Sequence, residues 1–167
     1  MKKIAQFKKI SFKQYQLDYQ TFFKENSQNH SYDSIKQPKR ATTGSAGYDF
    51  FSPESFKLAP KESIIILTGI RVKMETGWVL KLYPRSSLGF KYSIQLSNTV
   101  GIIDSDYYNT ENEGHILIKL TNYSQENKTL EIKSGEAFAQ GIFLEYGITY
   151  DDQTTKKRIG GIGSTNQ

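Results

Sequence analysis

The chain has 167 residues, with 22 basic and 17 acidic side chains, a formal net charge of +5 and no cysteine. This length fits a single domain, and the absence of cysteine excludes disulfides, thiolate metal sites and thiol catalysis. No apolar run approaches the roughly 20 residues that span a bilayer, and the start MKKIAQFKK lacks the apolar stretch of a secretory signal. We therefore expect a cytoplasmic protein without a membrane partner. Its lysines are scattered, so we do not expect it to bind nucleic acid.

The first predicted element is a helix over residues 11–25. Ser11 followed by Gln14 favours a capping box at its first turn. We expect the aromatic face of this helix to pack on its own subunit, with a partner-binding face as the alternative, and residues 26–37 to form a polar loop. The aromatic side chains that recur at three- and four-residue spacing, and so share one helical face, are Phe12, Tyr15, Tyr19, Phe22 and Phe23.

Beyond Pro38 the pattern changes to short β-rich runs separated by Gly, Pro, Asn and Ser. In one run the apolar Ile116, Ile118 and Leu120 alternate with other side chains, as a half-buried strand requires. With no crossover helix between the runs, we predict an all-β fold, an antiparallel sandwich or barrel with one N-terminal helix. Residues 158–167 hold three glycines and few packing side chains, so we expect a tail that is mobile until it binds something. The predicted strands are residues 47–51, 63–67, 70–74, 78–83, 94–97, 115–121, 129–132 and 137–146.

Two carboxylates stand in the densest polar constellation, residues 101–108. In an extended backbone Asp104 and Asp106 point to the same face, where they can bind a hard cation or provide a general base. The structural alternative is a solvated Asp104 beside a turn that starts at Asp106. The two histidines, His30 and His115, are far apart in the sequence and do not predict a zinc site.

Two further segments carry groups that suit phosphate. Arg85, Ser86 and Ser87 follow a predicted strand and the turn-forming Pro84, so a guanidinium and two hydroxyls stand together. Residues 160–165 are rich in glycine, which lets backbone N–H groups approach a phosphate closely, but they lack the spacing of a Walker loop. Taken singly, the first segment can be a polar turn and the second a flexible tail.

The order of these segments is more informative than any one of them. It resembles the five-motif series of the trimeric dUTPases, and the resemblance covers residues 38–167. The motifs are Ala46-Gly47-Tyr48-Asp49, Arg85-Ser86-Ser87, Asn98 with residues 101–107, Gly135-Glu136 leading to Ala139-Gln140, and Arg158 with Gly160-Gly161-Ile162-Gly163-Ser164-Thr165.

This resemblance implies a jelly-roll-like β fold that forms one domain and assembles as a homotrimer, with active sites shared between subunits. Residues 38–156 would form the β core, residues 157–167 a mobile glycine-rich C-terminal lid, and residues 1–37 an extension outside the family pattern. The implied reaction is the hydrolysis of dUTP to dUMP and diphosphate, with Mg2+ on the triphosphate.

The resemblance also implies a role for each matching residue. Asp104 would be the general base for the water that attacks the α-phosphorus, and Gln140 would hold that water or the phosphate chain. Asp49 would reach the metal through water. The groups expected on phosphate oxygens are Arg85, Ser86, Ser87, Arg158, Ser164 and Thr165. The groups expected around the nucleoside are Asn98, Gly101, Ile102, Ile103 and Tyr107, together with Ile162 and Gly163 of the lid.

Two departures from the family pattern stand out. Ile162 replaces the usual aromatic residue of the lid, so the lid is expected to close more weakly on the base. Residues 108–114 are longer than the usual tight hairpin, and we interpret them as a surface loop, with a docking feature as the alternative. Two other functions stay open. One is a dCTP deaminase, which would need a glutamate that residues 115–122 lack; the other is a nucleotide-gated regulatory protein whose partner binds residues 1–37 or 108–114.

Overall fold

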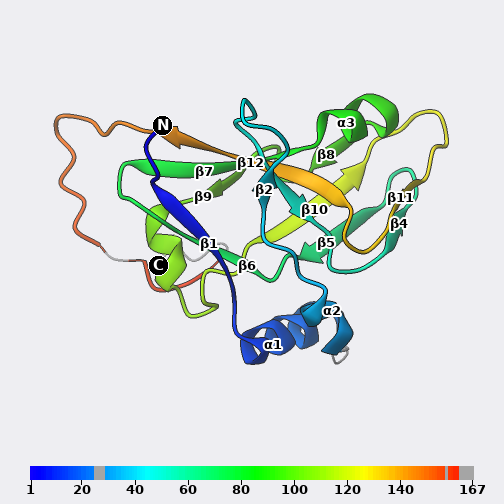
Figure 1. Cartoon of the computed structure of the whole chain (residues 1–167), viewed down its shortest axis with the longest axis horizontal. Helices are drawn as coiled ribbons and strands as arrows, with labels where there is room; N and C mark the ends of the chain where they lie inside the picture. The colour runs from blue at the N-terminus through cyan, green and yellow to red at the C-terminus, as the bar shows by residue number, and fades with distance from the viewer. Residues whose placement is uncertain (25–28, 157, 162–167) are drawn as a thin grey trace.

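The computed structural model describes residues 1–24, 29–156 and 158–161, with the backbone alone for residues 29 and 30. Short antiparallel strands form several small sheets around one hydrophobic core, and two helices lie together below them in Figure 1. The structure confirms the predicted all-β, jelly-roll-like class. No helix in the described part of the chain is long and apolar enough to cross a membrane.

The largest sheet has five antiparallel strands in the order β2-β3-β12-β7-β9. Its central strands supply part of the core, because Leu80, Leu82 and Phe138 are almost completely buried. Strand β12 pairs with both β3 and β7, and this position matters for the site described below. The strands are β2 (Lys39–Arg40), β3 (Tyr48–Phe51), β12 (Ala137–Glu145), β7 (Trp78–Pro84) and β9 (Gly101–Ile103).

Three smaller sheets complete the core. One has the order β5-β10-β8, and the others are the pairs β4-β11 and β1-β6. All eight predicted strands are present, with bounds within two residues of those predicted, whereas β1, β2, β4 and β9 were not predicted. The strands are β5 (Ser63–Leu67), β10 (Leu117–Asn122), β8 (Ile94–Leu96), β4 (Phe56–Leu58), β11 (Leu130–Ile132), β1 (Ala5–Lys9) and β6 (Ile70–Met74).

Residues 1–37 contain more regular structure than the predicted helix and loop. Strand β1 pairs with β6 along its whole length, although only Phe7 of its five side chains is buried. The predicted helix is α1 (Phe12–Phe23), and the Ser11 hydroxyl caps it by accepting a hydrogen bond from the Gln14 N–H at 3.1 Å. Within the segment predicted as a loop, the short helix α2 (Asn29–Asp33) forms.

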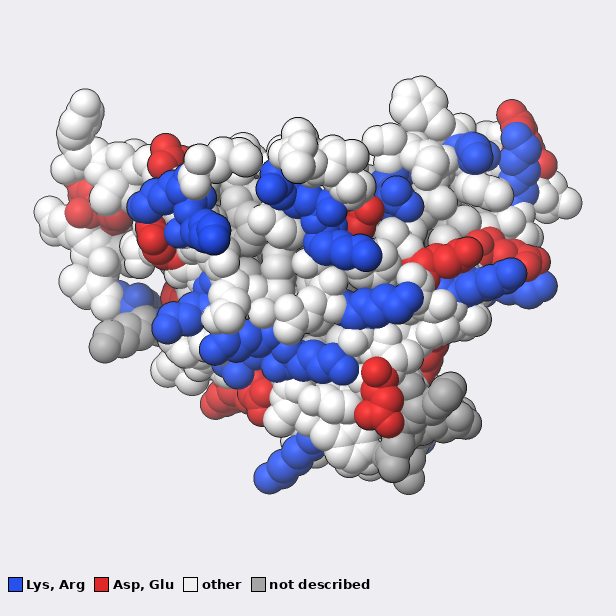
Figure 2. Space-filling model, in the orientation of Figure 1, with Lys and Arg blue, Asp and Glu red and all other residues white. Residues whose placement is uncertain are grey.

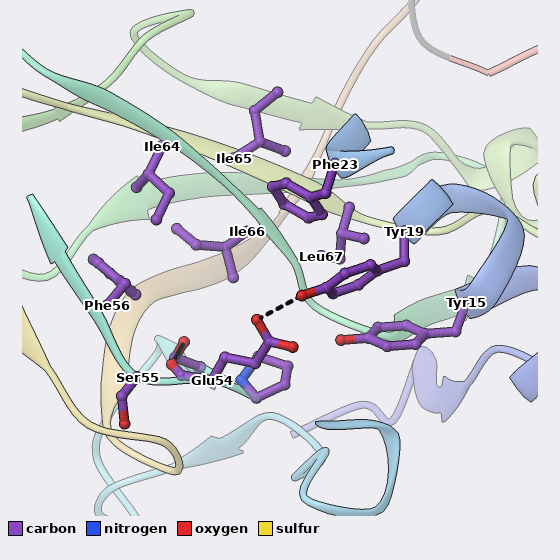
Figure 3. Close-up of a pocket in the computed structure, with 12 residues that line it drawn as sticks. Tyr15, Tyr19, Phe23, Glu54, Ser55, Phe56, Ile64, Ile65, Ile66 and Leu67 are labelled. Atoms are coloured by element: carbon purple, nitrogen blue, oxygen red, sulfur yellow. Dashed lines mark hydrogen bonds between the residues drawn. The ribbon is translucent and has the colours of Figure 1, made fainter. Parts of the chain in front are cut away.

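The aromatic face of α1 packs on its own subunit, as predicted. Tyr15 is 1% exposed, and Figure 3 shows Tyr15, Tyr19 and Phe23 in a row that faces β5 and Glu54 across a cavity of about 130 Å³. The Tyr19 hydroxyl donates to Glu54 Oε2 at 3.3 Å. Burial raises the pKa of the Tyr15 hydroxyl, and the charge of Glu54 raises it further. The last two rings of the face, Phe22 and Phe23, are 40% and 37% exposed.

Two further helices follow strands of the core and were not predicted. Helix α3 (Ser86–Tyr92) begins directly after β7, and its residues follow Arg85, which is its N-cap. The 3-10 helix η1 (Ser105–Asn109) begins directly after β9, with Asp104 as its N-cap. Both elements therefore carry motif residues at the point where a strand ends.

Basic side chains gather on the face that carries β1 and β2, as Figure 2 shows. Lys8 and Lys9 of β1 and Lys39 of β2 are exposed there. A positive face attracts polyphosphate anions over a long range. Since β2 pairs with β3, this face adjoins the strand that carries Asp49.

Candidate active site

The end of β7 brings three of the predicted motifs together. Gln140 of β12 lies opposite Asp49 of β3 on one side and Tyr83 of β7 on the other. Its Nε2 donates to the Pro84 carbonyl at 3.3 Å. Arg85 follows β7, and its Nε lies 3.3 Å from Asp49 Oδ1. These residues meet because β12 is the shared neighbour of the two strands that carry the other motifs.

This first cluster presents donors to solvent. The Arg85 side chain is 40% exposed, and Ser86 and Ser87 are exposed on the first turn of α3. A hollow of about 350 Å³ lies beside them. A Cβ on Gly47 would lie 2.6 Å from Gln140 Oε1, so a larger residue there would displace this amide. A guanidinium, hydroxyls and an amide arranged in this way can bind phosphate oxygens.

A second cluster surrounds a larger cavity of about 760 Å³. Strands β8 and β9 and the turn between them form one wall of it. Gly101 packs against β7 so closely that a Cβ there would lie 2.9 Å from the Leu82 Cβ. Six of the predicted nucleoside and phosphate residues line this cavity: Asn98, Gly101, Ile102, Ile103, Tyr107 and Arg158.

Tyr107 is the fixed part of this cavity wall. It is 4% exposed, its hydroxyl donates to the His115 carbonyl at 2.7 Å, and the hydroxyl accepts from Asn112 Nδ2 at 3.0 Å. Burial raises the pKa of the Tyr107 hydroxyl, although the hydrogen bond from Asn112 and the charge of Arg158 act in the opposite direction. The Tyr107 side chain is therefore a neutral phenol whose hydroxyl both donates and accepts a hydrogen bond.

Asp104 stands at the end of β9 with a side chain that is 50% exposed. Arg158 Nη1 lies 2.8 Å from Asp104 Oδ2 and 3.6 Å from Asp106 Oδ1. The predicted extended backbone is wrong here, because Asp106 lies in the first turn of η1. The two carboxylates nevertheless share one guanidinium, so they do lie close together.

The two clusters lie apart within one chain. In the pairing of β7 with β9, Ile103 lies opposite Leu80, so Asp104 follows at the level of the first half of β7. Arg85 is five residues beyond Leu80 along the same strand, a separation of about 16 Å at the rise of a β-strand. The predicted general base, Asp104, and the predicted phosphate ligand, Arg85, therefore lie at different places on one chain.

A dUTPase family model matches residues 33–166. The chain belongs to the dUTPase family. The deoxyuridine 5'-triphosphate nucleotidohydrolase of Lactococcus lactis is 42% identical over 134 residues, which cover 78% of this chain and 88% of that relative. The crystal structure of the dUTPase from Streptococcus mutans superposes with a TM-score of 0.63 at 30% identity, covering 86% of this chain and 97% of that one. The dUTPase of Staphylococcus bacteriophage 80alpha, solved with dUPNHPP, shares the fold with a TM-score of 0.65 at 21% identity, covering 93% and 90%.

Membership of the dUTPase family confirms the resemblance that the motif series predicts. Of the residues predicted to form a lid, Ile162, Gly163, Ser164 and Thr165 lie outside the described part of the chain. The structure brings two residues to the site that the sequence pattern did not predict there. Phe22 reaches the larger cavity from α1, and Asn112 holds the hydroxyl of Tyr107. No local pattern could have identified them, because both contacts depend on tertiary packing.

The loop over residues 108–114 has exposed positions, as predicted, and it also contacts its own subunit. Within residues 108–114, the Glu113 carboxylate accepts hydrogen bonds from the N–H and hydroxyl of Ser11, and Arg71 stacks on the Tyr108 ring at 3.7 Å. The loop therefore packs against the N-terminal helix and β6 of its own subunit. Gln14 does not complete the predicted capping box, since its side chain donates to Asp18 instead.

Proposed function

We propose that this chain hydrolyses dUTP to dUMP and diphosphate at sites shared between copies of itself. The observation that carries the proposal is the position of Asp104. Its half-exposed carboxylate follows β9, and β9 forms a wall of the cavity that holds the predicted nucleoside residues. The match to the dUTPase family supports the proposed reaction.

Asp104 accepts a proton from a water molecule, whose oxygen attacks the α-phosphorus. A bond forms between the water oxygen and phosphorus, while the bond from the α-phosphorus to the oxygen bridging to the β-phosphate breaks, and diphosphate leaves. A general base placed within hydrogen-bond reach contributes about 10²–10⁴-fold to the rate. Arg158 contacts Asp104 in this structure, so substrate binding has to draw its guanidinium toward the triphosphate and free the base.

The remaining groups orient the triphosphate. Arg85, Ser86 and Ser87 bind its oxygens from the end of β7, and Gln140 positions the phosphate chain or the attacking water beside them. Arg158, with Ser164 and Thr165 of the lid, covers the outer phosphates. Positioning and charge neutralisation supply most of the rate enhancement in phosphoryl transfer.

The nucleoside occupies the larger cavity. Backbone groups of Asn98 and of residues 101–103 read the uracil edge, and a base that leaves such buried groups unpaired is rejected by up to about 10⁴–10⁵-fold. The Tyr107 ring lies against the deoxyribose and leaves no space for a 2′-hydroxyl. Gly163 and Ile162 of the lid close over the base.

A homotrimer would join the two clusters, with Asp104 of one copy facing Arg85 of another. The separation of about 16 Å along β7 within one chain supports this arrangement. Exposed apolar side chains support it too, since Phe90 beside Arg85 is 93% exposed and Ile102 beside Asp104 is 49% exposed. Contact with another copy would cover both side chains.

Mg2+ fits this site as an ion carried by the nucleotide. In residues 1–24, 29–156 and 158–161, no three His, Cys, Asp or Glu side chains gather closely enough to hold a metal. A single carboxylate, Asp49, lies in the phosphate cluster. Because Mg2+ keeps several waters and takes phosphate oxygens as ligands, one carboxylate acting through water suits it. The bound ion would neutralise charge on the phosphates.

A diphosphate-release assay across dUTP, dCTP, dTTP and UTP tests the proposal. We expect turnover of dUTP with Mg2+, little turnover of the other three, and a loss of about 10²-fold or more in Asp104→Asn. Asp33→Asn, which changes an exposed carboxylate on α2, is the matched control and should keep full activity. Release of ammonia from dCTP would instead indicate a deaminase, and full activity in Asp104→Asn would show that another group is the base.

A further inference from the structure

The N-terminal helix is joined to the segment that follows η1 by a charged contact. The Glu113 carboxylate accepts hydrogen bonds from the Ser11 N–H at 2.8 Å and the Ser11 hydroxyl at 2.6 Å. Arg71 Nη1 lies 3.7 Å from the same carboxylate. Glu113 therefore caps the first turn of α1 from a position 102 residues further along the chain.

A buried histidine makes a second contact between the same two elements. His115 is completely buried, and its Nε2 accepts a hydrogen bond from the Gly69 N–H at 2.9 Å. The ring proton must then lie on Nδ1, which donates to Asp18 Oδ2 at 2.5 Å. The Tyr15 ring packs beside the imidazole, with centroids 6.0 Å apart. Asp18 on α1 thus fixes both the tautomer and the orientation of His115.

The segment held in this way also holds the sugar side of the nucleotide cavity. The Tyr107 hydroxyl donates to the His115 carbonyl, and Asn112, which directly precedes Glu113, donates to the same hydroxyl. The C-terminal segment rests on this loop as well, because the Glu111 N–H donates to the Ile159 carbonyl at 3.3 Å. Figure 1 shows this segment returning past η1 from the end of β12.

We propose that α1 is a positioning element for the nucleoside pocket, and that Asp18 and Ser11 help to set the discrimination between dUTP and UTP. Both residues precede residue 33, where the match to the dUTPase family begins. They act through His115 and Glu113 on the loop that holds Tyr107. The inference rests on the proposed function, and it assigns the N-terminal segment a part in substrate selection.

The physical reason is that exclusion of the UTP 2′-hydroxyl depends on how firmly the Tyr107 ring is held. A ring excludes a 2′-hydroxyl only if it cannot retreat by about half an ångström, so the groups that hold the ring decide how well the filter works. Tyr107 is held through its hydroxyl by two partners on one loop, and that loop is anchored to α1 at Glu113 and His115. Loosening the anchors should admit the ribonucleotide more than it harms dUTP turnover.

The test compares kcat/KM for dUTP and for UTP in Asp18→Ala. We expect the ratio of dUTP to UTP to fall about fivefold, the effect of one weakened hydrogen bond. Asp33→Ala is the control, because it removes an exposed carboxylate from the neighbouring helix α2. Circular dichroism and thermal unfolding establish that each variant is folded, and Asp18→Leu, which fills similar space without an acceptor, replaces Asp18→Ala if the latter does not fold.

A double-mutant cycle with Tyr107→Phe separates positioning from general destabilisation. If α1 acts through the tethered hydroxyl, Asp18→Ala combined with Tyr107→Phe lowers the ratio no further than Tyr107→Phe alone. A ratio that stays at the wild-type value in a folded Asp18 variant overturns the inference, as do effects that multiply in the double variant. A wild-type chain that hydrolyses neither nucleotide overturns the proposed function itself, and the inference with it.

Discussion

Glu113 offers a direct measurement of how much the contact between the loop and α1 contributes to stability. Its carboxylate accepts two hydrogen bonds from Ser11, at 2.8 and 2.6 Å, and its side chain is 32% exposed. In Glu113→Gln the amide oxygen can keep one of these bonds, while the charge and the second bond are lost. A hydrogen bond to a charged group contributes about 1.5–3 kcal/mol, and partial exposure reduces this, so we expect a loss of about 1–1.5 kcal/mol.

The pKa of Glu113 determines how this loss of stability depends on pH. Burial alone would raise the pKa of Glu113, but the hydrogen bonds from Ser11 and the charge of Arg71 outweigh it and hold the pKa below its ordinary value of 4.5. A carboxyl whose pKa is lowered by folding stabilises the protein above its unfolded-state pKa and loses that contribution as the pH falls through the folded-state pKa. The difference in the free energy of unfolding between wild type and Glu113→Gln should therefore be constant between about pH 7 and pH 5.5. It should become smaller below about pH 4.5.

Urea unfolding at these pH values measures this difference in unfolding free energy. In thermal unfolding near neutral pH, the midpoint of Glu113→Gln should lie about 2–6 °C below that of wild type. Glu111→Gln is the matched control, because Glu111 is an exposed glutamate in the same loop. Equal destabilisation by the two substitutions would refute the cap. So would a difference that persists unchanged well below the range in which carboxylates titrate.

Three other substitutions test separate parts of the account. Arg85→Ala should lower kcat/KM for dUTP by about 10²-fold or more, because it removes the guanidinium of the phosphate cluster; steady-state kinetics with a kcat/KM near the wild-type value would contradict this. Gly101→Ala should lower the free energy of unfolding by about 1–3 kcal/mol, since its Cβ would lie 2.9 Å from that of Leu82. Denaturant unfolding measures this free energy, and an unchanged value would contradict the prediction. Ile162→Phe should raise kcat/KM for dUTP about two- to tenfold by adding an aromatic contact to the base; an equal or lower value counts against a weakly closing lid.

Local patterns predicted the elements whose signals are local. Strands β5 and β6 have the predicted bounds, because runs such as Ser63–Leu67 are apolar and end at turn residues. The cap at Ser11 depends on a residue three positions away and was found for the same reason. Strand β1 was missed because most of its side chains are exposed lysine, alanine and glutamine, and its pairing with β6 joins segments more than 60 residues apart.

In the candidate site, too, local motifs predicted some features, whereas contacts between distant segments were not predicted. The motif series identified Asp49, Arg85 and Gln140, and the structure brings these three side chains together at the end of β7. The strand-like geometry predicted for Asp104 and Asp106 was wrong, because η1 begins between them. Contacts that join distant segments, such as Asp18 with His115, carry no periodic signal and could be seen only once the chain was folded.

Complementation between two inactive variants tests the central claim, that Asp104 of one copy works with Arg85 of another. Asp104→Ala and Arg85→Ala, carrying different tags, are co-expressed, and oligomers that contain both are purified on the two tags in turn. Each trimer that contains both variants has intact halves at one of its three sites, so it would restore roughly one third of wild-type dUTP hydrolysis, while each variant alone keeps only a small residual activity. Mixed oligomers with no more activity than the separate variants would show that the two residues do not meet across subunits.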